Sequence, residues 1–197
     1  MRTSLLCNML AALGLGLVPM VAFTQDQEKA QAKTQKVELA PDLVAEAPAN
    51  WKFQKPERQF RTHEFVLPSG EKGVADGFLM VTNFGKGVGG GLEANLQRWY
   101  GMVEQPDGSS TEKAAKKQDI ELKGFGRIVW LDMQGTYLDR PTPMSQEVTR
   151  RPNYRVFAAM IDAGKDGPYW IRATGPDSVM RLDRDGFERF LKSITKK

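Results

Sequence analysis

A glycine-rich run at residues 85–91, with the order Gly-Lys-Gly-Val-Gly-Gly-Gly, follows an apolar segment and precedes residues at helical spacing. Its first six residues satisfy the pattern G-x-G-x-x-G, in which glycines let a pyrophosphate approach the backbone at a helix N-terminus. A dinucleotide fold also requires a buried parallel strand after the helix, but Pro106-Asp107-Gly108 and a lysine-rich segment follow instead. The phosphate-binding P-loop pattern fails too, because Gly87, not Ser or Thr, follows Lys86.

We therefore favour a structural strand-to-helix turn for this run over nucleotide binding. Binding of another kind of anion remains the alternative, and its residues would be Lys86, Gly87, Gly89 and Gly90.

Two polar side chains follow in the predicted helix. Asn95 and Arg98 are three positions apart, so they can touch on one helix face. They are expected to hydrogen-bond the neighbouring loop or a sheet edge, and contact with a ligand or partner is the alternative. With the four loop residues they form the predicted ligand- or partner-binding set.

Asp132 lies between Leu131 and Met133 in the most apolar predicted strand. This position makes it a candidate for a buried carboxylate with a shifted pKa. A structural ion pair with a helix arginine such as Arg98 is the favoured interpretation. A glycosidase would need a second carboxylate facing Asp132, and the sequence pairs it with none.

Counts of two residue types exclude several kinds of site. His63 is the only histidine, so zinc sites with two imidazoles are excluded, and Cys7 is the only cysteine. His63 is expected on the surface of an early strand, and no serine lies in a nucleophile-elbow pattern. We predict no catalytic residue, no metal and no cofactor.

The elements that must position these residues follow from apolar periodicity and turn residues. In chain order they are strands at 58–67 and 76–84, a helix at 92–103, a hairpin of strands 115–122 and 127–138, a polar loop at 141–152, a hairpin of strands 154–162 and 169–174, and a helix from about 185. The second strand of the first hairpin is apolar on both faces, as in a strand covered on both sides. Successive hairpins predict an α+β fold, an antiparallel β-sheet flanked by helices.

Residues 1–24 have the positive start and apolar stretch of a signal peptide, which predicts a periplasmic or secreted, extracytoplasmic protein. Membrane anchorage by an uncleaved N-terminal segment is the alternative. Residues 25–47 are rich in Gln, Lys, Glu and Ala and predict a polar linker, and residues 48–197 predict a single α+β domain. Cleavage would remove Cys7 and leave a cysteine-free mature domain.

The charge is mildly basic, with 28 Lys and Arg against 24 Asp and Glu, and it is interspersed along the chain. No basic run marks a nucleic-acid footprint, so nucleic acid is not a predicted partner.

Several short motifs, taken in order, carry a family resemblance over residues 47–195. They are Ala47-Pro48-Ala49-Asn50-Trp51, Phe65–Pro68, Asn83-Phe84-Gly85, Gly89-Gly90, Asn95-x-x-Arg98-Trp99, Gly135-Thr136-Tyr137, Gly175-Pro176 and Phe187-x-x-Phe190-Leu191-x-Ser193. In these the chain resembles a family of uncharacterised exported bacterial proteins, similar in fold to the photosystem II protein PsbP and to the Ran-binding nuclear import factor. The resemblance implies an α/β/α sandwich and a binding or assembly role, and it brings no catalytic residue with it.

The functional expectation is an exported, non-catalytic binding or accessory protein of the cell envelope. It would recognise an envelope protein or component through the surface around the glycine run, Asn95 and Arg98. The alternative is a periplasmic domain that binds a small ligand or anion, and could hydrolyse it, with the glycine run and Asp132.

Overall fold

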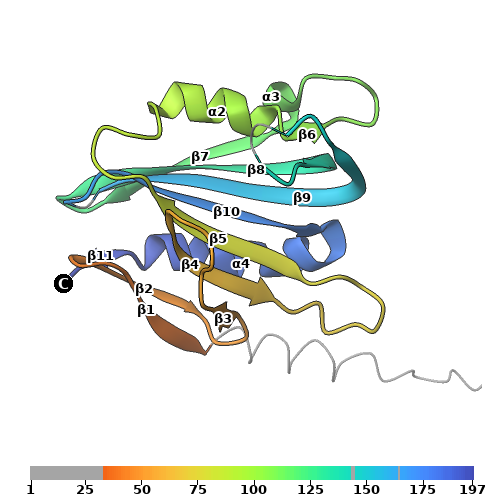
Figure 1. The fold of residues 1–197 in the computed structure, drawn as a ribbon. Coiled ribbons are helices and arrows are strands. Elements are labelled where there is room, and N and C mark those ends of the chain that lie inside the picture. Colours follow the sequence, from red (N-terminus) through yellow and green to blue (C-terminus); the bar gives the residue numbers. More distant parts are fainter. Residues whose placement is uncertain (1–32, 143–144, 164) are drawn as a thin grey trace, which may run out of the picture.

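Alternating apolar side chains build an antiparallel sheet of eight strands in the order β3-β4-β5-β10-β9-β8-β6, with β7 also paired to β8 (Figure 1). The computed structural model describes residues 33–142, 145–163 and 165–197, so the predicted signal peptide at 1–24 lies outside the described residues. The elements are β1 (Thr34–Ala40), β2 (Leu43–Pro48), β3 (Lys52–Gln54), β4 (Arg61–Leu67), β5 (Gly77–Asn83), α2 (Leu92–Tyr100), β6 (Val103–Glu104), α3 (Thr111–Ala114), β7 (Lys116–Leu122), β8 (Gly126–Asp139), β9 (Thr149–Asp162), β10 (Tyr169–Pro176), α4 (Asp177–Lys192) and β11 (Thr195–Lys196).

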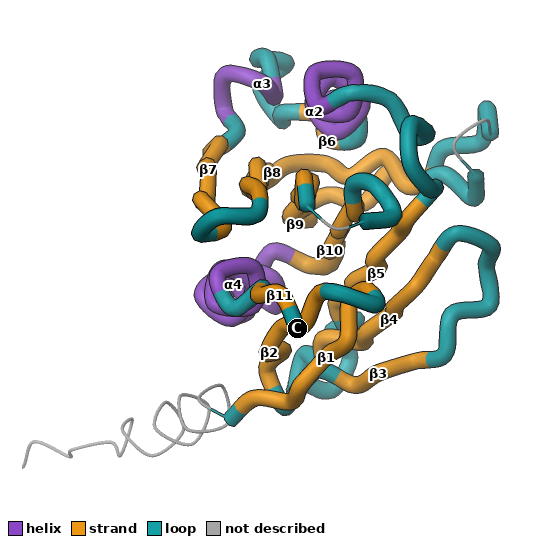
Figure 2. The backbone as a smooth tube through the Cα atoms, turned by 90° about the vertical axis from the view of Figure 1, so that its left-hand side faces the viewer, coloured by secondary structure: helices purple, strands orange, loops and turns teal. Residues whose placement is uncertain are grey.

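Helices cover both faces of the sheet, as Figures 1 and 2 show. Trp130 of β8 belongs to the core beneath α4, whereas its neighbour Leu131 belongs to the core beneath α2, and both are fully buried. This confirms that the strand is covered on both sides, and it confirms the predicted α+β class with an antiparallel sheet between helices. Both predicted hairpins are present, as β7 with β8 and β9 with β10.

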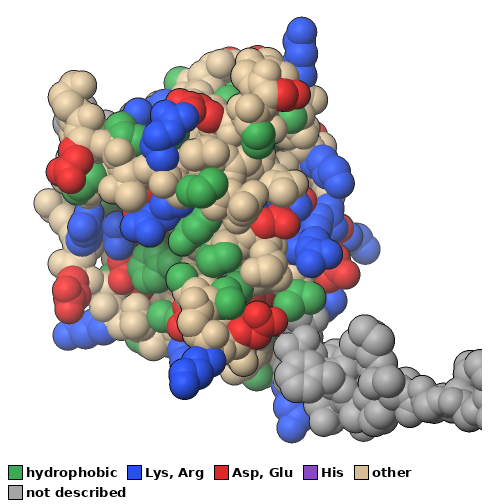
Figure 3. Space-filling model, turned by 90° about the vertical axis from the view of Figure 1, so that its right-hand side faces the viewer, with side chains coloured by type: hydrophobic (Ala, Val, Ile, Leu, Met, Phe, Trp, Pro, Cys, Tyr) green, Lys and Arg blue, Asp and Glu red, His purple; other side chains and the backbone are tan. Residues whose placement is uncertain are grey.

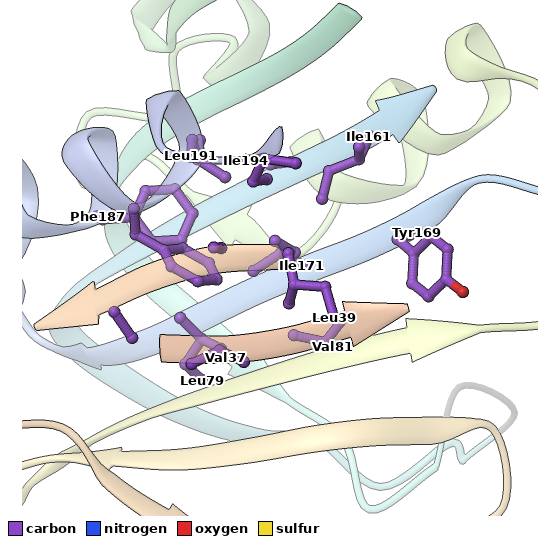
Figure 4. Close-up of a cluster of buried hydrophobic side chains, with 14 of the residues drawn as sticks. Val37, Leu39, Leu79, Val81, Ile161, Tyr169, Ile171, Phe187, Leu191 and Ile194 are labelled. Carbon is purple, nitrogen blue, oxygen red and sulfur yellow. The ribbon is translucent and has the colours of Figure 1, made fainter. Parts of the chain in front are cut away.

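The prediction of a polar linker is wrong for residues 34–47. These residues form β1 and most of β2, and β2 pairs with both β1 and β11 in a second, three-stranded sheet. Val37 and Leu39 alternate with charged residues, and they pack against β5 and α4 (Figure 4). The alternation was hard to recognise in the sequence because the segment has few large apolar residues. In β2, two of the buried positions are occupied by the small residues Ala45 and Ala47. Residues 25–32 lie outside the described residues.

Helix α4 begins at Asp177, eight positions before the predicted start near 185. Its first half contains Asp183, a buried carboxylate that accepts a hydrogen bond from Trp51 Nε1 at 3.1 Å. Gly186 within the helix lies against Pro48, and a Cβ atom there would stand 3.2 Å from the proline ring. The charged residues that stand among Val179, Met180 and Leu182 in the first half, together with the internal glycine, masked the helical pattern. Its apolar stripe nevertheless faces the core as predicted, with Phe187, Phe190 and Leu191 buried, and Ile194, two residues beyond the end of the helix, is buried as well.

Smaller boundary differences affect the other predictions. Helix α2 ends at Tyr100, not 103, because Gly101 stops it and Val103 pairs with Tyr137. The predicted loop at 141–152 gives its last four residues to β9. Within the described ranges, none of the helices is long and apolar enough to cross a membrane.

Candidate functional site

The glycine run forms a loop between β5 and α2 whose backbone conformation requires glycine. Gly85, Gly87, Gly89 and Gly90 have φ angles of 89°, 76°, 95° and 79°. Such left-handed values cost other L-residues about 1–2 kcal/mol each. At Gly89 a Cβ atom would also stand 3.0 Å from both the Phe84 ring and Trp170 Nε1. The loop therefore needs its glycines for its own folding, as the favoured interpretation of the run requires.

Asn95 holds this loop from the helix side. Its side chain is buried, and Nδ2 donates to the carbonyl oxygens of Gly89 at 3.0 Å, Gly90 at 3.4 Å and Gly91 at 2.9 Å. Arg98 Nη2 donates to the same Gly89 oxygen at 2.7 Å and to Asn95 Oδ1. The two helix residues thus contact each other and the neighbouring loop, and we call this arrangement of Asn95, Arg98 and residues 89–91 the glycine clasp.

A second attachment holds the loop to the β9–β10 turn. Asn83 accepts a hydrogen bond from Gly85 N at 2.9 Å and donates to Pro168 O at 3.2 Å. Gly167 lies so close that a Cβ atom there would stand 2.9 Å from the Lys86 Cα atom. Lys86 and Gly87 are exposed at the outer side of this attachment. Of the predicted set, the structure therefore unites Gly89, Gly90, Asn95 and Arg98 in the clasp and places Lys86 and Gly87 beside it.

An exposed apolar cluster lies next to the loop, and the sequence reasoning missed it. The rings of Phe60 and Phe84 have their centroids 5.4 Å apart, and Phe84 also contacts the backbone at Gly89. Phe60 is 49% exposed, Phe84 38% and Val88 55%. We call Phe60, Phe84 and Val88, together with residues 85–91, the loop surface. The sequence could not predict this cluster, because Phe60 and Phe84 belong to different chain segments and only the fold brings them together.

Phe60 has an unusual backbone for an aromatic residue. Its φ angle is 67°, a left-handed conformation that is an outlier for bulky side chains. The strand pairing imposes it, since Asn83 N donates to Phe60 O at 2.9 Å where β4 begins beside β5. Backbone strain of this kind is found most often at functional sites.

An open depression of about 540 Å³ lies at the same end of the sheet, and Asn83 is part of its wall. Its acidic side chains are Glu38 and Asp166. Burial raises the pKa of Tyr169 in this wall, and the nearby carboxylates of Asp166 and Asp42 raise it further. The depression is thus acidic and does not suit an anion. Its lining consists of Glu38, Leu39, Ala40, Pro41, Thr62, Asn83, Asp166 and Tyr169.

Asp132 is buried, as predicted, but it does not pair with Arg98. Its carboxylate accepts from Arg155 Nη1 at 2.5 Å and from Arg184 Nε at 3.1 Å, on the opposite face of the sheet from α2. Arg155 also donates to Asp177 at 2.7 Å. Burial disfavours the charged Arg155, yet its hydrogen bonds and charge interactions with Asp177 and Asp132 outweigh burial and raise its pKa. The network fixes α4 to the sheet and leaves both carboxylate oxygens of Asp132 occupied.

The remaining candidates do not form a catalytic arrangement. His63 is half-buried, not on the surface, with its ring 6.3 Å from that of Phe53. Burial lowers the pKa of His63, and this effect outweighs a hydrogen bond with the Glu38 backbone that acts to raise it. In the part of the chain that the structure describes, no three His, Cys, Asp or Glu side chains are grouped so that they could hold a metal ion.

Comparisons with known proteins give structural similarity without a family. No family model matches the chain, and no curated protein matches it by sequence. Among solved structures, the Ran-binding protein Mog1p of Saccharomyces cerevisiae is similar at 10% identity and a TM-score of 0.46, over 83% of this chain and 95% of Mog1p. LpqN, described as involved in cell envelope biogenesis of Mycobacterium tuberculosis, is similar at 10% identity and a TM-score of 0.44, over 91% of this chain and 99% of LpqN. Mog1p is of the Ran-binding type that the sequence resembles, but likeness at this level transfers no function.

Proposed function

We propose that this chain is an exported, non-catalytic binding protein of the cell envelope that recognises a protein partner through the loop surface. The observation that carries the proposal is Phe60. Neither burial nor backbone conformation favours phenylalanine there, because the residue is 49% exposed and has a φ angle of 67°. An aromatic side chain that contributes little to folding is well suited to bury itself against a partner.

The setting of Phe60 supports the same proposal. Phe84 and Val88 extend the exposed apolar area, and the glycine clasp holds the loop that carries Val88 in one conformation. A rigid loop loses little conformational entropy on binding, which favours affinity. Residues 85–91 thereby support the exposed side chains of Phe60, Phe84 and Val88, and Lys86 lies at the edge of this surface.

Export rests on the pattern of residues 1–24, which has a positive start followed by an apolar stretch. Mass spectrometry of the N-terminus of protein recovered from the envelope or periplasm should find that a segment of about two dozen residues has been removed. Recovery of an intact Met1 would overturn the cleaved signal and support an N-terminal anchor.

Site-specific photocrosslinking in the native host tests the proposed surface. A benzoylphenylalanine placed at residue 60 should give a discrete crosslinked species, and the same probe at Phe53 should not. Phe53 is a matched control because it is 56% exposed and lies on β3, at the opposite edge of β4 from β5.

Two substitutions complete the test. Phe60→Asn should abolish recovery of the crosslinked partner from a probe at residue 88, since asparagine tolerates the left-handed conformation and keeps the fold. Phe53→Thr should leave that recovery unchanged. Equal recovery with Phe60→Asn and wild type, with both proteins folded, would refute the loop surface as the binding site.

A further inference from the structure

A second feature lies on the face of the large sheet that carries α2. There Arg172 of β10 stands beside Met80 of β5, and Met80 stands beside Glu64 of β4. Helix α2 packs over β8, β9 and Trp170, whereas on this face none of the described helices lies over β4 and β5 (Figure 2). The side chains of Arg172 and Met80 remain partly accessible.

Arg172 has no carboxylate partner among the described residues. Its guanidinium donates only to methionine sulfurs, from Nη1 to Met102 Sδ at 3.4 Å and from Nη2 to Met80 Sδ at 3.6 Å. Thioether sulfur is a weak acceptor, and the buried Nε atom has no partner. A half-buried cation with such partners requires an explanation, because desolvation of an unpaired charge is costly.

Trp170 adds a second unpartnered donor on the same face. Its Nε1 atom is buried without a hydrogen-bond partner, two residues before Arg172 in β10. Side chains two residues apart in a strand share one face and stand about 7 Å from each other. Trp170 Nε1 lies beneath Gly89, whereas the Arg172 guanidinium lies beside Met80 and Met102, so Arg172 is the donor that stands over the open part of this face.

The surroundings of Arg172 are apolar and partly enclosed. Half-buried apolar and aromatic side chains lie on this face, namely Val66, Phe78, Met80, Met102 and Tyr154. A hydrogen bond of 3.1 Å from Arg58 Nη1 to Pro141 O joins the end of the β8–β9 hairpin to the segment before β4. On the side of the molecule drawn in Figure 3, hydrophobic side chains gather near the middle.

We propose that this face binds a single-chain amphiphile, with a carboxylate at Arg172 and an acyl chain along Met80, Phe78 and Val66. Glu64 on this face is already paired with Arg61, so Arg172 is left, within the described chain, as a cation without a carboxylate, and it matches one anion with an apolar body. A peptide strand is disfavoured, because β5 and β10 are paired along both edges and offer no free backbone. The inference does not rest on the proposed protein partner of the loop surface.

The test compares dodecanoate with dodecanol, both below their micellar concentrations, by NMR of the protein labelled at its methionine methyl groups. Dodecanoate should shift the Met80 and Met102 signals and should bind at least about tenfold more tightly than dodecanol, a difference of about 1.4 kcal/mol. Equal affinity for the acid and the alcohol, or no shift at these two methionines, would overturn the proposal.

Variants of Arg172 separate charge from packing. Arg172→Met should lose the preference for dodecanoate, and Arg172→Lys should retain at least part of it. Arg181→Gln is the control, because Arg181 is exposed on α4 beneath the other face, and it should leave binding unchanged. Retention of the full preference by a folded Arg172→Met would refute the assignment. If that variant does not fold, the wild-type titration still decides.

A final arm distinguishes a free amphiphile from a membrane surface. The protein is sedimented with vesicles of phosphatidylcholine alone and with vesicles containing phosphatidylglycerol. Binding of monomeric dodecanoate without sedimentation supports the proposal. Sedimentation with the anionic vesicles and no binding of monomeric dodecanoate would replace it with recognition of a lipid surface.

Discussion

Replacement of Asn95 by alanine tests whether the glycine clasp determines the stability of the loop. The substitution removes a donor that makes two short bonds, to Gly89 O at 3.0 Å and Gly91 O at 2.9 Å, and a longer one to Gly90 O. Each such bond contributes about 0.5–1.5 kcal/mol net. The two short bonds together predict a loss of about 1–3 kcal/mol in the free energy of unfolding.

The assay is urea denaturation followed by tryptophan fluorescence, since Trp170 lies directly beneath Gly89. For a chain of this size the same loss corresponds to a decrease in Tm of about 2–12 °C. Hydrogen exchange at the amides of residues 89–91 should increase more than exchange in β8 and β9, because the substitution loosens the loop and leaves the central strands paired.

Two controls identify the cause of the loss. Asn95→Leu keeps a similar side-chain volume and raises helix propensity but has no donor, so it should be destabilised about as much as Asn95→Ala. Gln97→Ala, at an exposed position of the same helix, should stay within about 0.5 kcal/mol of wild type. Wild-type stability of Asn95→Leu would refute the hydrogen-bond reasoning and assign the role of Asn95 to packing.

Three further substitutions test other parts of the structure by the same denaturation assay. Burial raises the pKa of Asp183 above its ordinary value of 3.8, although hydrogen bonds from Trp51 and Asn50 act to lower it. The wild-type protein therefore loses stability as pH rises from 3.8 through the pKa of the folded state. Asp183→Asn should flatten this loss by about 1.4 kcal/mol per unit of raised pKa, and an unchanged pH profile would contradict it. Asp132→Ala leaves Arg155 and Arg184 without their shared acceptor and should lower the free energy of unfolding by about 3–5 kcal/mol. A decrease below about 1 kcal/mol would count against the network. Gly89→Ala should lower the free energy of unfolding more than Gly108→Ala does. Both glycines have a positive φ, but only at Gly89 would the added Cβ meet neighbours within 4 Å. Equal decreases would disprove the close packing at Gly89.

The sequence predicts the parts of the fold in which local pattern and burial agree. The hairpin of β7 and β8 follows from the alternating Ile120 and Leu122 before Lys123-Gly124 and the apolar run after it. The stripe of α2 follows from Leu92, Leu96 and Trp99. The antiparallel class follows from such hairpins, because short turns connect neighbouring antiparallel strands.

The missed elements share a physical cause, which is that long-range contacts supply what local pattern lacks. Strand β2 buries mainly small side chains, such as Ala45 and Ala47, and gains its stability from α4 and β1. The first half of α4 mixes charged residues with Val179, Met180 and Leu182, and Asp183 there is buried with a hydrogen bond from Trp51.

The candidate site divides in the same way. Contact between Asn95 and Arg98 was predictable, since helix geometry alone brings residues three apart together. The pairing of Phe60 with Phe84 was not, because it depends on the register of β4 against β5. The partners of Asp132 likewise come from β9 and α4, at positions that no local pattern relates to it.

The pairing of β2 with β11 also has a kinetic consequence. Glu46 N donates to Ser193 Oγ across 147 positions of the chain, and Val44 is paired with Thr195 beside it. Contacts between such distant residues slow folding, because the intervening chain must first be ordered. During synthesis, Leu43–Pro48 therefore leaves one strand edge unpaired until residues 195–196 have been made. Until then the early part of the chain is an incomplete folding unit, open to chaperones and proteases.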